Sequence, residues 1–346
     1  MRRLLVNILV LLVTLALLVP FSEFAVRMVF SDVTTTGGDL SWFERRWNEG
    51  NVRFNRWGYR DREVEQRKRP GTYRILVIGD SFTYAPGVAF GERYTERVQD
   101  ALRGGDRPYE VINAGQPGAE TVQHARALLA ALRADPYPDP DFVLVQWYVN
   151  DVEGADKRGR DDPAPLWPDR PQHYRLVSRS ALYYVLDRQW GALQRTLGRA
   201  GSYPDYMRAR FGDPRSAESM RASSELRCLL RLAKDNGLDL GVVLFPVLRH
   251  PTGDGYPFAF LHERMLDICA QEGVPCLDLR ETYSGWEPAD RELWANRFDS
   301  HPGPLAHRLA AQRLLERFAG HWQGGPVGAR AARQPVQMPA GCSAMF

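Results

Sequence analysis

The stretch RILVIGDSFTYAPGV, residues 74–88, passes abruptly from apolar to small and polar residues. Its first half predicts a buried strand that ends at Gly79, with Asp80 and Ser81 directly after it. One interpretation is a turn, because Asp and Ser side chains often bond nearby backbone groups after strands. The other is a nucleophilic hydroxyl held at a strand-to-helix corner. That second interpretation requires a base, an orienting acid and an oxyanion hole from elsewhere in the chain.

Further short apolar runs alternate with helical patterns along the chain. Together with the first, the runs cover residues 73–78, 109–112, 142–147, 238–245 and 274–277. Strand–helix alternation favours a parallel sheet covered by helices on both faces. We therefore predict an α/β fold, a flavodoxin-like three-layer sandwich with a five-stranded parallel sheet, preceded by one N-terminal transmembrane helix.

The composition fits a globular chain with no nucleic-acid partner. The 346 residues are 44% hydrophobic, enough for one large domain or two small ones. The formal charge is +3, but the arginines are spread along the chain and interleaved with acids. This pattern does not form a nucleic-acid patch. No zinc-binding spacing or phosphate-binding loop is visible, and we expect no metal and no cofactor.

The N-terminus predicts a membrane anchor. Arg2 and Arg3 precede an uncharged apolar run over residues 4–21, about the minimum for a membrane span. A cleaved signal peptide is the alternative, but the small-x-small pattern of a cleavage site is poorly matched after Phe21. The basic pair before the span places the N-terminus in the cytoplasm and the rest of the chain outside it, in the periplasm.

That location bears on the four cysteines, because an oxidising compartment permits disulfides. Cys269 and Cys276 lie on a predicted helix and on the next strand, so these two thiols can meet. Buried free thiols are the alternative for all four cysteines.

The chain divides into four parts by composition. Residues 1–30 form the anchor, and 31–72 a polar and aromatic stalk with a segment packed on the domain edge. Residues 73–322 form the main α/β domain, with an insertion at about 151–221 that is rich in Pro, Arg and aromatics. We expect those aromatics to form a small core of the insertion, with some lining a substrate groove. Residues 323–346 lack periodicity and are expected to be a disordered tail.

Polar or glycine features follow four of these elements at one predicted edge of the sheet. In open parallel sheets, ligands bind outside the carboxyl ends of the strands. Ser81 follows the first strand, Gly118 lies after the second and Asn150 after the third, and Asp299 and His301 come just before the last helix. Each has a plain structural interpretation as a turn, cap or loop residue. Together they supply a hydroxyl, a backbone N–H, an amide and a carboxylate beside an imidazole, the parts of an acyl-transfer site.

These blocks resemble those of the SGNH (GDSL-type) hydrolase superfamily, in a membrane-anchored bacterial form. GDSFT at 79–83, NAGQPG at 113–118, YVND at 148–151 and DSHP at 299–302 are similar to its four blocks, in order. FNRWGYRD at 54–61 is similar to the segment that precedes the domain in anchored members. The resemblance spans roughly residues 73–320.

The resemblance implies a role for each site residue. Ser81 is the nucleophile, His301 the base and Asp299 the acid that orients it. The oxyanion hole is made by the backbone N–H groups of Ser81 and Gly118 and by the side-chain amide of Asn150. Asp80 is left as a structural residue. The weaker base candidates, which lie in no matching block, are His250, His262 and His307.

The sequence departs from the family pattern at two positions. Only Ser300 separates Asp299 from His301, where the family usually has two residues, and Tyr148 stands where a glycine is usual. Side chains two apart in an extended segment point to the same face. We therefore predict that Asp299 bonds His301 through a loop more extended than a helical turn. Tyr148 is expected to narrow the pocket.

The resemblance implies an anchored serine esterase that hydrolyses an acyl or acetyl ester. Its expected partners are an acylated small molecule, glycan or lipid as substrate, and the membrane through the N-terminal helix. Two alternatives remain: an O-acyltransferase that uses the same acyl-enzyme, and a non-catalytic envelope scaffold with the same fold.

Overall fold

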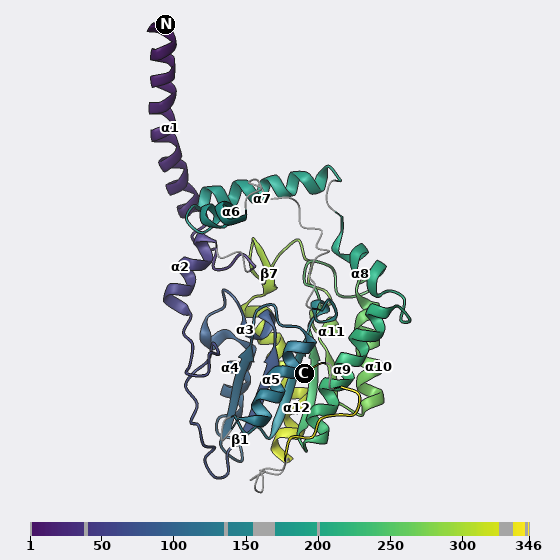
Figure 1. Ribbon diagram of the computed structural model, residues 1–346. Helices are drawn as coiled ribbons and strands as arrows, with labels where there is room; N and C mark the ends of the chain where they lie inside the picture. The colour runs from purple at the N-terminus through teal and green to yellow at the C-terminus, as the bar shows by residue number, and fades with distance from the viewer. Residues whose placement is uncertain are drawn as a thin grey trace.

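A computed structural model describes most of the chain. The described residues are 2–37, 41–134, 138–154, 170–198, 201–324, 335–342 and 345. A long helix at the N-terminus projects from a three-layer domain, and a second helix crosses the top of that domain (Figure 1).

Five parallel strands form the central sheet, in the order β2-β1-β3-β4-β5. This is the flavodoxin-like order, so the predicted fold class is confirmed. The strands are β1 (Tyr73–Gly79), β2 (Tyr109–Gly115), β3 (Phe142–Trp147), β4 (Asp239–Leu244) and β5 (Cys276–Asp278). Each matches one of the predicted apolar runs. Strands buried on both faces read as continuous apolar runs, which is why the sequence identified them.

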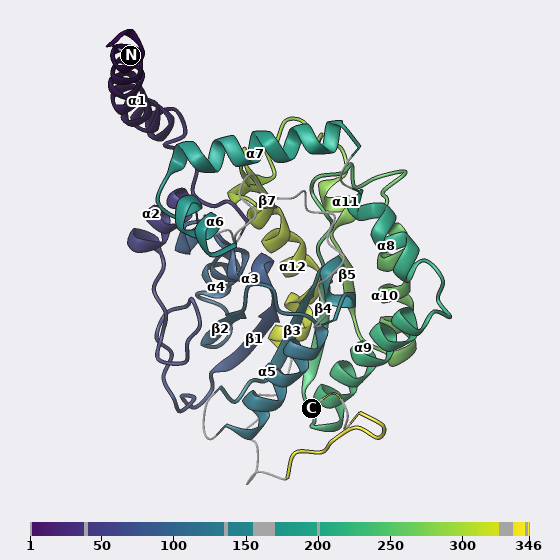
Figure 2. The ribbon, with the colours of Figure 1, turned by 45° about the horizontal axis from the view of Figure 1, so that its top comes forward.

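Helices cover both faces of the sheet (Figure 2). One face packs on α5 (Thr121–Arg133), α9 (Ala217–Asp235) and α10 (Ala259–Glu272), through a core that includes Leu128 and Leu229. The other face packs on α4 (Tyr94–Leu102), α11 (Arg280–Tyr283) and α12 (Pro304–Gly324), through residues such as Val98 and Leu314.

Short elements surround the carboxyl edge of the sheet. They are α3 (Ser81–Tyr84), η1 (Phe90–Glu92), η2 (Val149–Val152) and the hairpin of β6 (Trp294–Asn296) with β7 (Asp299–Pro302). The β6–β7 pairing is antiparallel. The sequence predicted an extended segment around His301 but not a paired strand.

The N-terminal helix α1 (Arg2–Val29) is the one described helix long and apolar enough to cross a membrane. Residues 33–37 and 41–44 are packed, within the range predicted to hold both a stalk and a segment on the domain edge. Val33, Thr35, Thr36 and Phe43 are buried, and α2 (Trp42–Asn51) follows against the domain. The helix α1 is therefore joined to the α/β domain by a packed segment.

An aromatic cluster lies where these parts meet, made of Phe30, Phe43, Tyr184 and Phe298. The ring centroids of Phe30 and Phe298 are 5.1 Å apart, and those of Tyr184 and Phe298 are 5.8 Å apart. The cluster joins the end of α1, the segment after it, the insertion and the residue just before β7.

The described part of the insertion contains three helices before α9. They are α6 (Arg170–Val177), α7 (Ala181–Thr196) and α8 (Tyr203–Phe211). The aromatics do not form a separate core, which corrects the prediction. Tyr184 belongs to the aromatic cluster, and Tyr203 packs on Phe258 with ring centroids 5.6 Å apart. Trp167, another aromatic residue of the insertion, lies outside the described residues.

The prediction of a disordered tail is wrong for residues 335–342. Cys342 is buried and forms a disulfide with Cys228 of α9, and the amide N–H of Gln337 donates to Asn236. The other tail positions after residue 324, except Met345, lie outside the described residues. Cys269 and Cys276 form the second disulfide, so this pair does meet, as the sequence allowed.

Candidate active site

The geometry of the site begins with two glycines at adjacent strand ends. Gly79 of β1 is paired with Gly115 of β2. A Cβ on Gly79 would lie 2.2 Å from Thr83 Oγ1, and one on Gly115 would lie 2.3 Å from the backbone nitrogen of Tyr84. Only glycine fits at these positions, because α3 turns back directly onto the strand ends. This explains the small residue just before Asp80 and Ser81.

Asp80 fixes the corner on which Ser81 stands. Its carboxylate accepts from the backbone N–H of Phe82 at 2.8 Å, and its own N–H donates to Gln146 Oε1 at 3.0 Å. Asp80 is therefore the N-cap of α3. The Ser81 side chain takes no part in that cap and stays partly exposed at the mouth of β1.

Ser81, His301 and Asp299 form one hydrogen-bonded line. Ser81 Oγ lies 2.8 Å from His301 Nε2, and His301 Nδ1 lies 2.6 Å from Asp299 Oδ1. The same carboxylate oxygen accepts from the backbone N–H of His301 at 3.0 Å. The residues of β7 are extended, so the predicted bond through an extended loop, rather than a helical turn, is confirmed.

The electrostatics of the pair suit a base that accepts a proton. Burial raises the pKa of Asp299, but the charge and hydrogen bonds of His301, with a bond from Thr35, hold the pKa at about 2. Burial also lowers the pKa of His301, yet the charge of Asp299 and its bond outweigh burial and leave the pKa above its usual value. Asp299 thus stays charged at neutral pH and stabilises an imidazolium.

The contact of Thr35 with Asp299 is not predicted by any pattern in the sequence. Thr35 Oγ1 donates to Asp299 Oδ2 at 2.8 Å, so both carboxylate oxygens are engaged. Thr35 lies six residues after the end of α1, in the segment predicted to be a stalk. No local pattern marks such a residue, because its partner is 264 positions away.

We expect Thr35→Val to lower kcat by about tenfold, roughly the net value of one hydrogen bond to a charged group. Valine keeps the shape but removes the donor, so Asp299 would hold the imidazole less firmly. A kcat, KM and pH series on a soluble aryl ester measures this, with kcat and the pH profile changing more than KM. Thr36→Val is the matched control, because buried Thr36 bonds Ser41 and Glu44 instead. An equal loss in both variants would mean that local packing, not the bond to Asp299, is responsible.

The two other predicted oxyanion donors lie on the loops after β2 and β3. Gly118 has a φ of +72°, and its loop is tied to β1 by the N–H of Gln116, which donates to Gly79 O at 2.9 Å. Asn150 lies in η2, with its amide beside the Asp80 carboxylate. Burial raises the pKa of Asp80 to about 6, against the opposing effects of Phe82 N–H, His301, Gln146 and Asn150.

Asn150→Ala should lower kcat by about 10²–10³ with a smaller effect on KM, as for the loss of one oxyanion donor. The donor acts on the charge that develops in the transition state, so ground-state binding changes less. Steady-state kinetics of the full-length protein in detergent test this, with thermal unfolding as the check on folding. An unchanged kcat would make Asn150 a plain loop residue.

Aromatic rings pack beside the triad. The Phe82 and Tyr148 centroids are 4.1 Å apart, and those of Phe82 and His301 are 5.4 Å apart. Tyr148, at the position where the family usually has glycine, therefore fills space against the ring that contacts the candidate base. Its effect on the width of a substrate pocket stays a prediction.

The other histidines have different partners. His262 Nδ1 lies 3.0 Å from Asp278 Oδ1, and His307 Nδ1 accepts from the backbone N–H of Tyr94 at 3.3 Å. The carboxylate of Asp151 accepts from Tyr148 N–H at 2.7 Å and lies 3.3 Å from His124 Nδ1.

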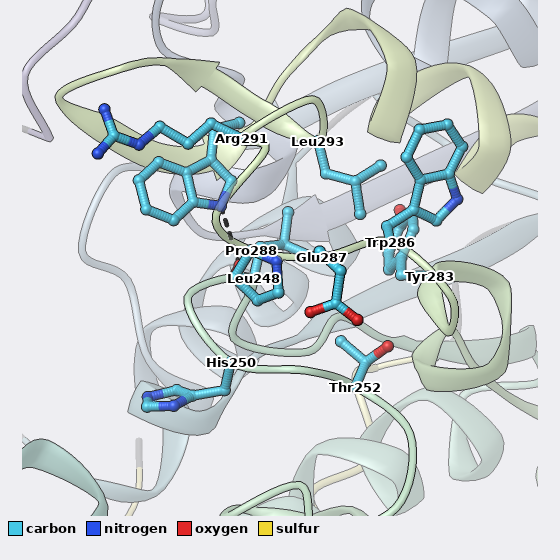
Figure 3. Close-up of a pocket in the computed structure, with 10 residues that line it drawn as sticks. Leu248, His250, Thr252, Tyr283, Trp286, Glu287, Pro288, Arg291 and Leu293 are labelled. Atoms are coloured by element: carbon cyan, nitrogen blue, oxygen red, sulfur yellow. Dashed lines mark hydrogen bonds between the residues drawn. The ribbon is translucent and has the colours of Figure 1, made fainter.

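His250 lines a pocket together with Trp286, Glu287 and Trp294 (Figure 3), with a volume of about 220 Å³ that includes open solvent. Glu287 and Thr252 lie there beside Leu293, and Trp294 Nε1 donates to Leu248 O at 2.9 Å. No triad residue lines this pocket. Within the described ranges, no group of three or more His, Cys, Asp or Glu side chains is arranged to hold a metal.

The segment at 54–61 contacts the loop after α3 and the strand β2, which border the site. Buried Arg60 donates to the carbonyls of Tyr84 and Val88, at 3.0 and 2.7 Å, and so holds the loop after α3. Asp61 accepts from the N–H of Asn113 in β2 at 2.8 Å. These contacts explain physically why the motif FNRWGYRD contains Arg60 and Asp61.

Known proteins provide an independent comparison. The model of the GDSL-like Lipase/Acylhydrolase family matches residues 77–309. No curated protein matches the chain.

Three solved structures are similar at low identity. A lipolytic protein of the G-D-S-L family from Veillonella parvula DSM 2008 is 16% identical, covering 71% of this chain and 98% of that one, with a TM-score of 0.43. TesA is 16% identical, with 72% and 99% covered and a TM-score of 0.45. Axe2, an acetylxylan esterase from Geobacillus stearothermophilus, is 17% identical, with 72% and 95% covered and a TM-score of 0.42. The family assignment rests on the family model rather than on these structures.

Proposed function

Because the chain belongs to the GDSL-like Lipase/Acylhydrolase family and is an ester-bond hydrolase, we propose that it is a membrane-anchored serine esterase of the cell envelope. The observation that carries the mechanism is the line from Ser81 Oγ through His301 to Asp299, at 2.8 and 2.6 Å. The proposed substrate is an acyl or acetyl ester on an envelope glycan or lipid.

The proposed mechanism has two halves. Ser81 Oγ attacks the ester carbonyl carbon while His301 Nε2 takes the hydroxyl proton. The carbonyl oxygen becomes an oxyanion, stabilised by Ser81 N–H, Gly118 N–H and the Asn150 amide. The bond to the alkoxy oxygen then breaks, and the alcohol leaves with the proton from His301. Water, activated by the same imidazole, splits the acyl-enzyme and releases the carboxylic acid.

Transfer to a sugar hydroxyl instead of water would use the same acyl-enzyme. The test is turnover of an acetylated glycan by full-length protein in detergent, with the products measured in the presence of a free acceptor glycan. Release of acetate that depends on Ser81 supports the esterase. Acetate appearing on the acceptor would instead support an O-acyltransferase, and no reaction of either kind would favour a non-catalytic scaffold.

Two features support placing the domain outside the cytoplasm. Arg2 and Arg3 precede the apolar part of α1. Lysines and arginines in a short segment next to a membrane span stay on the cytoplasmic side. All four cysteines are paired, as Cys228 with Cys342 and Cys269 with Cys276, which suits an oxidising compartment such as the periplasm.

Residues 4 to about 21 should hold the full-length protein in the membrane, with its C-terminus outside the cytoplasm. The run lacks charge and is long enough to span. Membrane fractionation, N-terminal sequencing and paired C-terminal reporters, one active only in the periplasm and one only in the cytoplasm, measure this. A mature N-terminus near residue 23, or activity of the cytoplasmic reporter alone, would contradict it.

A further inference from the structure

The most unusual surface outside the site is an apolar stripe along α7. Leu186, Trp190 and Leu193 of α7, and Leu197 at its C-cap, follow one another at spacings of three or four residues, so they lie on one side of the helix. Their exposed fractions are 50, 37, 49 and 56%. An exposed apolar patch of this kind marks an interaction surface. We call these four residues the α7 stripe.

The opposite face of α7 packs on the protein. Tyr184 and Gly191, which lie about half a turn away from the stripe, are buried. Arg188 on the same side donates to the carbonyl of Phe298 at 2.9 Å. The stripe therefore faces away from the domain, toward the side on which α1 projects (Figures 1 and 2).

The start of α7 is fixed at the base of the apolar part of α1. Glu23 is the first charged residue after Arg3, so it marks the level at which a span would leave the hydrocarbon. Its carboxylate accepts from Ser180 Oγ at 2.7 Å and from the N–H groups of Ala181 and Leu182, each at 2.9 Å. In the proposed anchoring, these bonds hold the first turn of α7 at the depth of the membrane surface.

From that point α7 runs across the top of the domain rather than along α1 (Figures 1 and 2). Its 16 residues give a length of about 24 Å. Arg179 precedes it and Arg195 lies in its last turn, both exposed, and Trp190 belongs to the stripe. Arginine and tryptophan are typical of the membrane–water interface. Depth, direction and composition together fit an interfacial amphipathic helix.

The same helix is connected to the catalytic acid. Phe298, which accepts from Arg188, immediately precedes Asp299. Thr35, which donates to Asp299, is six residues from the end of α1, and six residues span at most about 20 Å. The triad therefore lies close beneath the surface formed by α7 and the base of α1.

We propose that α7 lies in the lipid–water interface of the bilayer that holds α1, with the α7 stripe inserted among the lipids. This positions Ser81 for acyl esters carried by amphiphilic molecules in that leaflet. The proposal rests on the proposed anchoring and ester hydrolysis, and it adds a second membrane contact and the substrate's physical state.

The test is a depth measurement on full-length protein in vesicles of phosphatidylcholine and phosphatidylglycerol. All four native cysteines are in disulfides, so a single new cysteine can carry a spin label. The labelled variants are L186C and L193C on the stripe, M220C as an equally exposed control on α9, and L11C within α1. Collision with oxygen, which enters lipid, is compared with collision with a water-soluble nickel chelate.

Spin labels at positions 186 and 193 should collide more often with oxygen than with the nickel chelate. The label at position 220 should show the reverse. Nickel contact at the stripe equal to that at Met220 overturns the proposal. Protection of the stripe from both reagents overturns it in favour of a second copy or another protein. The Leu11 label separates the two hypotheses: if it lies in water, the anchoring itself fails, whereas Leu11 in lipid with the stripe in water refutes only the interfacial helix.

The functional arm compares L186Q/L193Q with the unsubstituted protein on two esters. Turnover of a lipid-borne acetyl ester in vesicles should fall severalfold, while turnover of a water-soluble acetyl ester should stay unchanged. Equal turnover of the lipid-borne ester by both proteins would refute the role in presenting substrate. If the unsubstituted protein hydrolysed neither ester, the proposed ester hydrolysis itself would be refuted.

Discussion

Ser81→Ala should reduce ester turnover by as much as about 10⁶-fold in kcat, because loss of a triad nucleophile costs about that much. It should also abolish labelling by a fluorophosphonate probe, which reacts with an activated serine hydroxyl. The fold should persist, since the cap of α3 is the Asp80 side chain and the Ser81 hydroxyl is partly exposed. Unchanged thermal unfolding of the full-length variant would verify this.

The matched control is Ser300→Ala. Ser300 is adjacent to His301 in sequence, and its hydroxyl accepts from Arg249 Nε at 2.7 Å. This variant should keep fluorophosphonate labelling and most of the activity. Labelling that survives in Ser81→Ala would mean that another serine is the nucleophile.

The first four strands of the sheet were predictable because almost all of their residues are buried, on both faces. Residues 75–78 illustrate this, since four consecutive apolar side chains can only be accommodated where helices cover both sides. The strand order was predictable only as a class, because strand–helix alternation allows few parallel arrangements. The positions of Ser81 and Asn150 followed from reading the residues just past each strand.

The hairpin that carries His301 was less accessible from sequence. The β6 strand has three residues and no clear alternation, and its pairing with β7 depends on a close backbone approach. A Cβ on Gly303 would lie 2.2 Å from the carbonyl oxygen of Trp294, and the N–H of Gly303 donates to Leu293 O at 2.7 Å. Such contacts depend on tertiary structure, which periodicity does not report.

The other features that the sequence did not predict depend on partners far away along the chain. The tail residue Cys342 pairs with Cys228, 114 positions away, and aperiodic sequence around it gave no sign of order. Thr35 completes the hydrogen bonds of Asp299 from a segment that composition alone marks as polar. In both cases the side chain is ordinary and only its partner makes it important.

His301→Ala should be nearly as severe as Ser81→Ala, and the double variant should be no worse than either single one. Base and nucleophile act as a unit through the 2.8 Å contact of Nε2 with Oγ, so their losses are not additive. Steady-state kinetics of the three full-length proteins measure this. A double variant slower than both singles by the product of their effects would indicate that the two residues act separately.

Replacing Asp299 should lower kcat clearly less than replacing Ser81 or His301, because Asp299 orients the imidazole and does not transfer the proton. In Asp299→Asn the pH profile should also change. The rate falls on the acid side as His301 becomes protonated, and the charge of Asp299 raises the pKa of His301. Removing that charge lowers the pKa of His301, so the acid limb of the kcat/KM profile should move to lower pH while the plateau falls.

Asp151→Asn is the control, since Asp151 contacts Tyr148 N–H and His124, and this variant should leave the acid limb where it is. If Asp151→Asn moved the limb and Asp299→Asn did not, the acid of the triad would be misassigned, although the pair of Ser81 and His301 would stand.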